Sequence, residues 1–180
     1  MTKLLYMEDP YLKECDATVT KVNESKYVIL DQTIFYPKGG GQLNDIGDMT
    51  RDGDVFNVSY VGKFSGETSH EVDRPGLNVG DKVHCRLDWD RRYRMMRSHT
   101  AAHVLITILC NKTGALVTGN ELTLEKTRFD FSLENFDREI FMSCIEEANQ
   151  FFKKHVPVKT YELPREELSL IHISEPTRPY

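Results

Sequence analysis

The chain has 180 residues, of which 39% are hydrophobic and 28% are charged, and its formal net charge is −5 at pH 7. This composition is typical of a globular protein and excludes disorder as the expected state. The length is sufficient for one large domain or two small ones. The negative charge argues against a surface that binds nucleic acid everywhere, but it leaves room for a local basic strip.

The sequence also argues against a membrane-spanning protein and against a secreted one. No apolar run approaches the roughly 20 residues that span a bilayer, and MTKLLYMEDP places acidic residues and a proline where a signal peptide needs its apolar segment. Four cysteines, Cys15, Cys85, Cys110 and Cys144, are widely separated without a C-x-x-C pair. We therefore expect a cytoplasmic protein with reduced thiols and no membrane partner.

Residues 1–90 predict a small β-barrel or sandwich, because short strand-like runs alternate with Gly, Asp, Asn and Pro. The runs are DATVTKVN (16–23), KYVILDQTIFYP (26–37), VFNVSYVGKF (55–64) and DKVHCRLDW (81–89). In the last run, apolar residues at 83, 85, 87 and 89 alternate with polar ones. His84 is therefore expected to face away from the core.

The pattern changes to helical at DWDRRYRMM. Asp88 or Asp90 can cap a helix that continues to Gly114, and the helix is apolar nearly all round after Thr100. We expect it to be a central helix.

A strand KTRFDFS (126–132), an amphipathic helix from about Asn135 to His155 and a strand VPVKTYEL (156–163) follow. We therefore predict an α+β protein with a β-barrel domain at residues 1–90 and an α/β sandwich at residues 91–167, incomplete at its C-terminal end. Residues 168–180 resemble a translated sequencing adapter, so we predict a non-native tail there.

Three consecutive glycines, Gly39, Gly40 and Gly41, stand in the run DQTIFYPKGGGQLNDIGD (31–48). They cost more backbone entropy than a simple turn requires, which indicates positive φ or a close approach of backbone to another group. Gln42 adds a carboxamide at the exit. The run matches neither a phosphate-binding loop nor a dinucleotide fingerprint. A plain hairpin or bulge is the alternative.

Two histidines, His99 and His103, stand four positions apart in RSHTAAHVL (97–105). On a helix they are separated by about 40° around the axis and about 6 Å along it, so both imidazoles can reach one zinc ion. Two structural histidines on a core helix are the alternative. Thr100 stands where a zincin protease has its general-base glutamate, which excludes that class.

Together the segments TIFYPKGGGQLNDIGD, DWDRRYRMMRSHTAAHVL and TRFDF resemble the free-standing alanyl-tRNA editing proteins of the AlaX type, which are similar to the editing domain of alanyl-tRNA synthetase. The resemblance implies a zinc-containing, ATP-independent deacylase that acts in trans for translation fidelity. It would hydrolyse mischarged alanine tRNA that carries serine or glycine. The acceptor end of alanine tRNA is the implied partner, and no DNA partner is expected.

The resemblance also implies roles for single residues. His99 and His103 would be two of the four ligands of one zinc ion, and Thr33 and Gln42 would be catalytic-pocket residues beside the amino acid. Gly39, Gly40 and Gly41 would bind the substrate. We expect the Thr33 hydroxyl to recognise the serine hydroxyl, because such hydrogen bonding penalises alanine. Pairing of Thr33 across a strand is the alternative.

A basic strip precedes the histidines at Arg91, Arg92, Arg94 and Arg97. By itself it would be a solvated helix face. With the resemblance, Arg92 and Arg97 become expected tRNA contacts, since guanidinium groups suit phosphates and stacked bases. Pairing of either arginine with Asp88 or Asp90 is the alternative.

The chain departs from the family pattern in its metal ligands. The family's other two zinc ligands lie in a Cys-x-x-x-His motif, and this sequence contains no such motif. We therefore expect a truncated chain that carries half of a zinc site. The alternative function is a non-catalytic tRNA-binding fragment.

Overall fold

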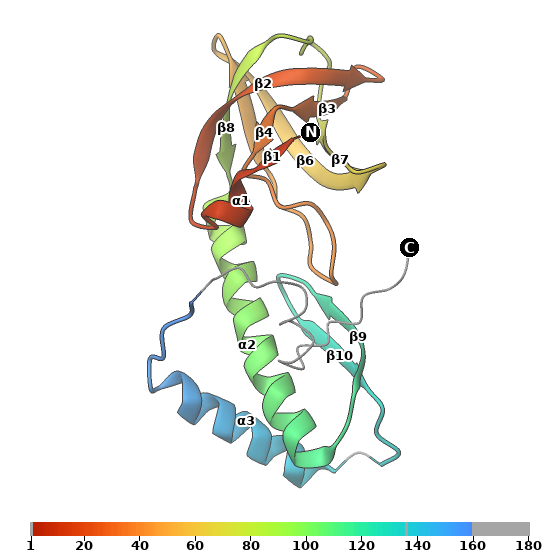
Figure 1. Cartoon of the computed structure of the whole chain (residues 1–180), viewed down its shortest axis with the longest axis vertical. Coiled ribbons are helices and arrows are strands. Elements are labelled where there is room, and N and C mark those ends of the chain that lie inside the picture. The colour runs from red at the N-terminus through yellow and green to blue at the C-terminus, as the bar shows by residue number, and fades with distance from the viewer. Residues whose placement is uncertain (1, 136, 160–180) are drawn as a thin grey trace, which may run out of the picture. The chain divides into compact units, whose positions relative to one another are not determined.

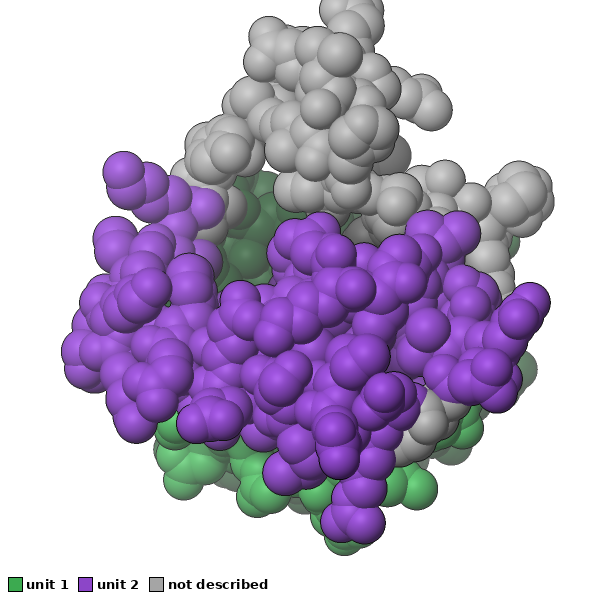
Figure 2. Space-filling view, turned by 90° about the horizontal axis from the view of Figure 1, so that it is seen from below, with its two compact units in different colours: residues 1–102, 120–128 green, residues 103–119, 129–180 purple. Residues whose placement is uncertain are grey.

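The computed structural model describes residues 2–135 and 137–159. The chain divides into two compact units, which Figure 2 colours separately. The first contains residues 1–102 and 120–128, and the second contains residues 103–119 and 129–180.

Six antiparallel strands close into a β-barrel in the first unit (Figure 1). Their order around the barrel is β2 (Glu14–Asn23), β3 (Tyr27–Leu30), β7 (Glu67–Val72), β6 (Asp54–Phe64), β5 (Gly47–Arg51) and β8 (Lys82–Leu87), which returns to β2. Closure leaves no unpaired sheet edge among these strands. The mixed α+β class with an N-terminal barrel is confirmed.

Alternation along each strand fills the barrel. In β8, Val83, Cys85 and Leu87 are buried between exposed polar neighbours, and they join a core that includes Phe35 and Phe56. Side chains on alternate sides of a strand explain this pattern. His84 faces outward, as predicted.

A short parallel pair adjoins the start of the chain. Strand β1 (Lys3–Leu4) pairs with β4 (Gln32–Thr33), and the single-turn helix α1 (Leu5–Glu8) follows β1.

Helix α2 (Trp89–Thr113) begins and ends where the sequence signals predict. The Arg91 N–H donates to Asp88 Oδ1 at 3.0 Å, so Asp88 is the N-cap residue. Gly114 ends the helix with φ +72°, and its N–H donates to the Cys110 carbonyl at 2.8 Å.

The second unit contains helix α3 (Arg138–Phe152), whose N-cap Asp137 accepts hydrogen bonds from two backbone N–H groups. Cys144 on α3 packs with Leu109 of α2 and Ala115 in a small apolar cluster. Strands β9 (Val117–Leu122) and β10 (Thr127–Phe131) form a two-stranded sheet.

Four strands, β1, β5, β7 and β9, were not predicted. In β7 the buried positions include Thr68, Ser69 and His70, so no apolar alternation marks it. Residues 156–159 form no strand, and the rest of the predicted strand at 156–163 lies outside the described residues, as does the predicted tail at 168–180. The division at residue 90 and the cytoplasmic location stay predictions. Among the described helices, none is long and apolar enough to cross a membrane.

Candidate functional site

The glycine loop, residues 37–44, is closed at its base by Tyr36 and Asp45. The Tyr36 N–H donates to Asp45 Oδ2 at 2.6 Å, and the Asp45 N–H donates to the Tyr36 carbonyl at 2.9 Å. These two bonds hold the ends of the loop together, and the loop is also bonded to β6, where the Lys38 N–H donates to the Val61 carbonyl at 2.8 Å.

The tip of the loop turns tightly between Gly39 and Gln42. Each of these residues donates its N–H to the carbonyl of the other, at 3.2 and 2.9 Å. Gly40 and Gly41 between them have φ values of +58° and +79°. This left-handed backbone is available to glycine without steric cost.

Gly41 is also approached closely by β9. The Leu122 N–H donates to the Gly41 carbonyl at 2.8 Å. A Cβ atom added at Gly41 would lie 1.6 Å from Asn120 Oδ1 and 2.9 Å from the Asn120 carbonyl oxygen. Both predicted reasons for glycine thus hold at Gly41, whereas Gly39 has neither positive φ nor a contact closer than 4.0 Å.

A cavity of about 310 Å³ lies where the loop meets the end of β9 and the start of β10. It is lined by Lys38, Gly39, Gly41, Gln42, Leu43, Asn120, Glu121, Leu122 and Arg128. The structure thus brings three of the predicted loop residues to one cavity, and Gln42 is only 7% exposed there. Carboxamides, charged groups and loop backbone together make this cavity polar, and its size suits a small substrate group.

Thr33 lies on β4 and is fully buried. Its Oγ1 is 2.8 Å from His70 Nε2 and accepts the Phe35 N–H at 3.1 Å. His70 Nδ1 is 2.9 Å from the Val28 carbonyl, which can only accept, so Nδ1 carries the proton and Nε2 accepts from Thr33. Burial lowers the pKa of His70 to about 4, which keeps the ring neutral.

Arg92 is enclosed rather than presented to a ligand, and this corrects its expected role as a tRNA contact. Its Nε lies 2.9 Å from Asp45 Oδ2, and its Nη atoms donate to the carbonyls of Pro10 and Ile34 at 2.9 and 2.6 Å. The side chains of Arg92 and Asp45 are each 4% exposed. The partner is Asp45, not the neighbouring acids of the helix.

The remaining arginines of the strip divide between two roles. Arg91 donates from Nε and Nη2 to the Asn44 carbonyl of the glycine loop, at 3.2 and 3.1 Å. Arg94 and Arg97 are exposed, and the Arg97 guanidinium lies 5.8 Å from the centre of the Tyr93 ring. Arg97 therefore remains available to a nucleic acid, and its contact with tRNA stays a prediction.

His99 and His103 both lie on α2, at helical positions i and i+4. His99 is partly exposed and His103 is exposed. Across residues 2–135 and 137–159, no group of three or more His, Cys, Asp or Glu side chains could hold a metal ion. These residues supply two imidazoles and do not fit a complete four-ligand zinc site.

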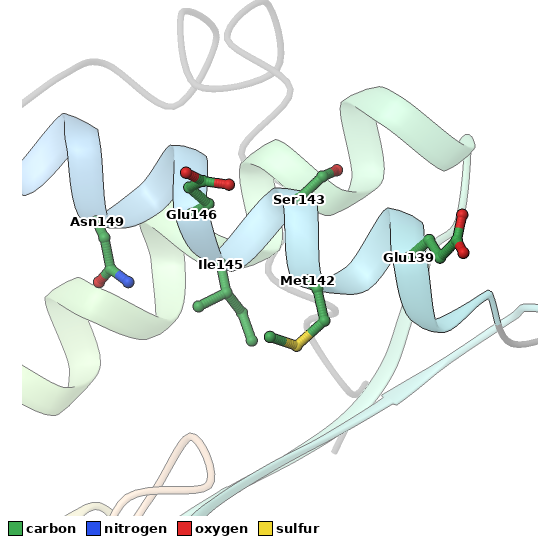
Figure 3. A pocket seen from close by; sticks show the side chains of 6 residues that line it. All are labelled: Glu139, Met142, Ser143, Ile145, Glu146 and Asn149. Atoms are coloured by element: carbon green, nitrogen blue, oxygen red, sulfur yellow. The ribbon is translucent and has the colours of Figure 1, made fainter.

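A second, larger cavity of about 560 Å³ lies on α3 and contains no predicted site residue (Figure 3). All of its lining side chains come from this one helix: Glu139, Met142, Ser143, Ile145, Glu146 and Asn149. A feature formed by a single helix lacks the convergent polar groups of a catalytic site.

Three residues that matter at the site escaped the sequence reasoning: Asp45, His70 and Asn120. Asp45 belongs to the glycine run, but Arg92, with which it forms a buried ion pair, is 47 residues away. No local spacing in the sequence connects the two residues. His70 and Asn120 lie in strands without apolar alternation.

Comparison with known proteins identifies the class of protein first. A family model described as "tRNA synthetases class II (A)" matches residues 7–91. The chain is 49% identical over 173 residues to "Alanyl-tRNA editing protein AlaX-M" of Methanosarcina barkeri, which covers 93% of this chain and 71% of that protein. It is 44% identical over 174 residues to the protein of the same name from Saccharolobus solfataricus, with 95% and 72% covered.

A similar stretch occurs within a much longer protein. The "Alanine--tRNA ligase" of Ignicoccus hospitalis is 41% identical over 169 residues, which cover 92% of this chain and 18% of the ligase. The chain therefore belongs to the free-standing alanyl-tRNA editing proteins of the AlaX type. The predicted family and enzyme class, an aminoacyl-tRNA deacylase, are confirmed.

Proposed function

We propose that the protein hydrolyses, in trans, the ester bond between alanine tRNA and a wrongly attached serine or glycine. Family membership supports tRNA as the partner. The observation that carries the site assignment is the close approach of Asn120 to Gly41, which places a polar cavity beside the glycine loop. We assign the amino-acid end of the substrate to this cavity.

The reaction requires limited chemical assistance, because an aminoacyl ester is already activated. Water attacks the carbonyl carbon, the bond to the ribose oxygen breaks, and that oxygen takes a proton, which yields the free amino acid and the tRNA. Hydrogen-bond donors beside the carbonyl stabilise the charge that develops on its oxygen. Gln42 and Asn120 both line the cavity, and their carboxamides can donate to the substrate or accept from the attacking water.

Selectivity for serine is the role that we propose for Thr33. Its hydroxyl donates to His70 and accepts from the Phe35 N–H, which leaves one acceptor position on Oγ1. Thr33 is fully buried and does not line the loop cavity, so a serine hydroxyl reaches this acceptor only when the surrounding side chains move, and alanine has no hydroxyl to use it. The fixed tautomer of His70 orients the Thr33 hydroxyl for this purpose.

We propose that His99 and His103 are two ligands of a zinc ion. Their i, i+4 spacing on α2 supports this. The described residues do not complete the ligand set, so no catalytic step is assigned to the metal.

The decisive experiment compares seryl, glycyl and alanyl tRNA as substrates for the wild type and for Gln42→Ala. We expect hydrolysis of seryl and glycyl tRNA, little hydrolysis of alanyl tRNA, and a fall of about 100-fold for Gln42→Ala if it supplies one carbonyl-oxygen donor. No hydrolysis by the wild type, or an unchanged rate for Gln42→Ala, contradicts the proposal. A His99→Ala, His103→Ala double variant in the same assay tests the metal ligands, since equal rates defeat that assignment.

The second candidate function is a non-catalytic tRNA-binding protein. The lack of a complete metal-ligand group among the described residues favours it. Binding of tRNA without hydrolysis of any of the three esters would establish this candidate.

A further inference from the structure

Three aromatic side chains, two exposed and one partly buried, form a cluster at the start of α2. The rings of Trp89 and Tyr93 stack with centres 5.7 Å apart and an interplanar angle of 19°. Tyr11, from the segment before β2, lies 5.9 Å from Trp89 at an angle of 46°. Tyr11 is 59% exposed and Tyr93 is 42% exposed. Grouped exposed aromatics on a soluble protein indicate a binding surface.

A cation lies against this cluster at two places. Lys13 Nζ is 4.8 Å from the centre of the Trp89 ring, and Arg97 Cζ is 5.8 Å from the centre of the Tyr93 ring. Positions 89, 93 and 97 share one face of α2, and Arg97 lies about 12 Å along the axis from Trp89. Cation–π contacts hold both cations near the rings. Because these side chains are already restricted, they lose less conformational entropy when an anion binds.

The acidic residues near the cluster in the sequence have other hydrogen-bond partners or point away from it. Asp9 Oδ1 accepts the Tyr11 N–H at 2.8 Å, and Asp88 caps the helix. Asp90 is exposed, but it follows Trp89 and so points about 100° away around the axis. The surface formed by Tyr11, Lys13, Trp89, Tyr93 and Arg97, here called the aromatic–cation surface, thus contains two cations and no acidic residue on a chain of net charge −5.

We propose that the aromatic–cation surface binds the single-stranded acceptor end of tRNA, with Lys13 and Arg97 on phosphates and an unpaired base on an exposed tyrosine ring. Alternating rings and cations suit this ligand, because bases stack on aromatic faces and phosphates require positive charge. The inference builds on the proposed function, since it names the residues that hold the substrate. Four of the five residues lay outside the predicted site.

The chain contains a built-in probe for this binding, because Trp89 is its only tryptophan. We expect its fluorescence to change when uncharged alanine tRNA transcript is added to the full chain. A transcript that lacks the unpaired 3′ nucleotides should bind at least tenfold more weakly, because it loses the stacked base. Equal affinity for the two transcripts would overturn the proposal.

Variants separate stacking from charge. Tyr93→Ala should weaken binding about tenfold, and Tyr93→Phe should not, because the ring is retained. The Lys13→Ala, Arg97→Ala double variant should weaken binding and lower the slope of log K against log salt by about 1.4, which corresponds to two phosphates of a single strand.

The matched control is the double variant Lys26→Ala, Arg74→Ala. These two cations also lie over aromatic rings, those of Tyr27 and Phe56, but elsewhere on the barrel. The control should bind tRNA within twofold of the wild type. If both double variants lose affinity equally, the effect is one of net charge and the proposal fails. Circular dichroism and thermal unfolding confirm that each variant is folded.

Deacylation kinetics distinguish this inference from the proposed function. If the wild type hydrolyses seryl tRNA and the Lys13→Ala, Arg97→Ala variant has an unchanged KM, the aromatic–cation surface is not the tRNA site. If the wild type hydrolyses nothing while Trp89 fluorescence still reports the acceptor end, the proposed function fails and the RNA-binding surface stands. Failure of tRNA to bind at all refutes the surface and favours another class of partner.

Discussion

Arg92 and Asp45 form a buried ion pair that joins the base of the glycine loop to the first turn of α2. Asp45 also accepts the Tyr36 N–H, and Arg92 also binds the Pro10 and Ile34 carbonyls. One guanidinium therefore holds three separate segments of the first unit in place.

Removal of Arg92 is expected to be strongly destabilising. The Arg92→Met variant leaves the Asp45 carboxylate buried without its cation, which typically costs about 3 to 5 kcal/mol. Urea unfolding should show this loss in the free energy of unfolding. Arg94→Met, an exposed neighbour on the same helix, is the control and should change it by less than about 0.5 kcal/mol. Equal losses for the two variants would show that the ion pair is not what holds the loop.

Alanine substitutions along the three glycines should have graded effects. Gly39→Ala should be nearly neutral, because its backbone and surroundings accept a Cβ atom. Gly40→Ala should cost about 1 to 2 kcal/mol from left-handed backbone strain alone. Gly41→Ala should cost more and also lower deacylation, because its Cβ collides with Asn120.

Asn120→Gly supplies the second half of that test. In the Gly41→Ala background it removes the side-chain collision and leaves the 2.9 Å contact with the Asn120 carbonyl, so partial recovery of stability is expected. Thermal unfolding of the single and double variants measures the recovery. If the stability changes of the two single variants add exactly in the double variant, the side chains at positions 41 and 120 do not collide.

Protonation of His70 should make stability depend on pH. Its pKa in the folded protein is about 4, below the value of about 6.5 in an unfolded chain, so the unfolded state binds the proton more readily. The free energy of unfolding should therefore be complete above about pH 6.5 and decline as pH falls toward 4, by on the order of 3 kcal/mol in total. Urea titrations at pH 7 and pH 5 measure the decline.

Two variants identify the group responsible. His70→Gln should lose most of this pH dependence. His84→Gln is the opposing control, because the hydrogen bond that His84 Nδ1 donates to Asp16 raises the pKa of His84 and makes its contribution decline as pH rises. A pH profile that survives His70→Gln would assign the effect to other groups.

Substitution of Thr33 distinguishes a role in substrate selectivity from a purely structural role. Thr33→Val removes the hydroxyl with little change of shape, and it leaves His70 Nε2 and the Phe35 N–H without a partner. If Thr33 recognises serine, the ratio of kcat/KM for seryl to glycyl tRNA should fall about tenfold, while Thr33→Ser should preserve it. A purely structural role would lower stability and leave that ratio unchanged.

The elements that carry local signals were predictable from the sequence. Alternation indicated β8, and an aspartate and a glycine indicated both ends of α2. The unpredicted strand β7 buries Thr68, Ser69 and His70, and the His70 ring is bonded to Thr33 and to the Val28 carbonyl, which are distant in sequence.

At the site, too, local features were predictable from the sequence and contacts between distant residues were not. The glycine run indicated its own left-handed turn, because backbone conformation is a local property. Asn120 contacts Gly41, which is 79 residues away in the sequence, and Asp45 pairs with Arg92, which is 47 residues away. A single sequence carries no signal for such distant pairs. Arg92 and Arg97 look alike in the strip, and only the structure shows that Arg92 is buried in an ion pair while Arg97 is exposed.

The bonds made by the glycine loop have a consequence for insertions and deletions. Tyr36 and Asp45 fasten its two ends to each other, while Lys38, Gly41 and Asn44 within it are bonded to β6, β9 and α2. A change of length between residues 37 and 44 would break these bonds. The loop therefore accepts replacement of the side chain at position 39 more readily than any change in its number of residues.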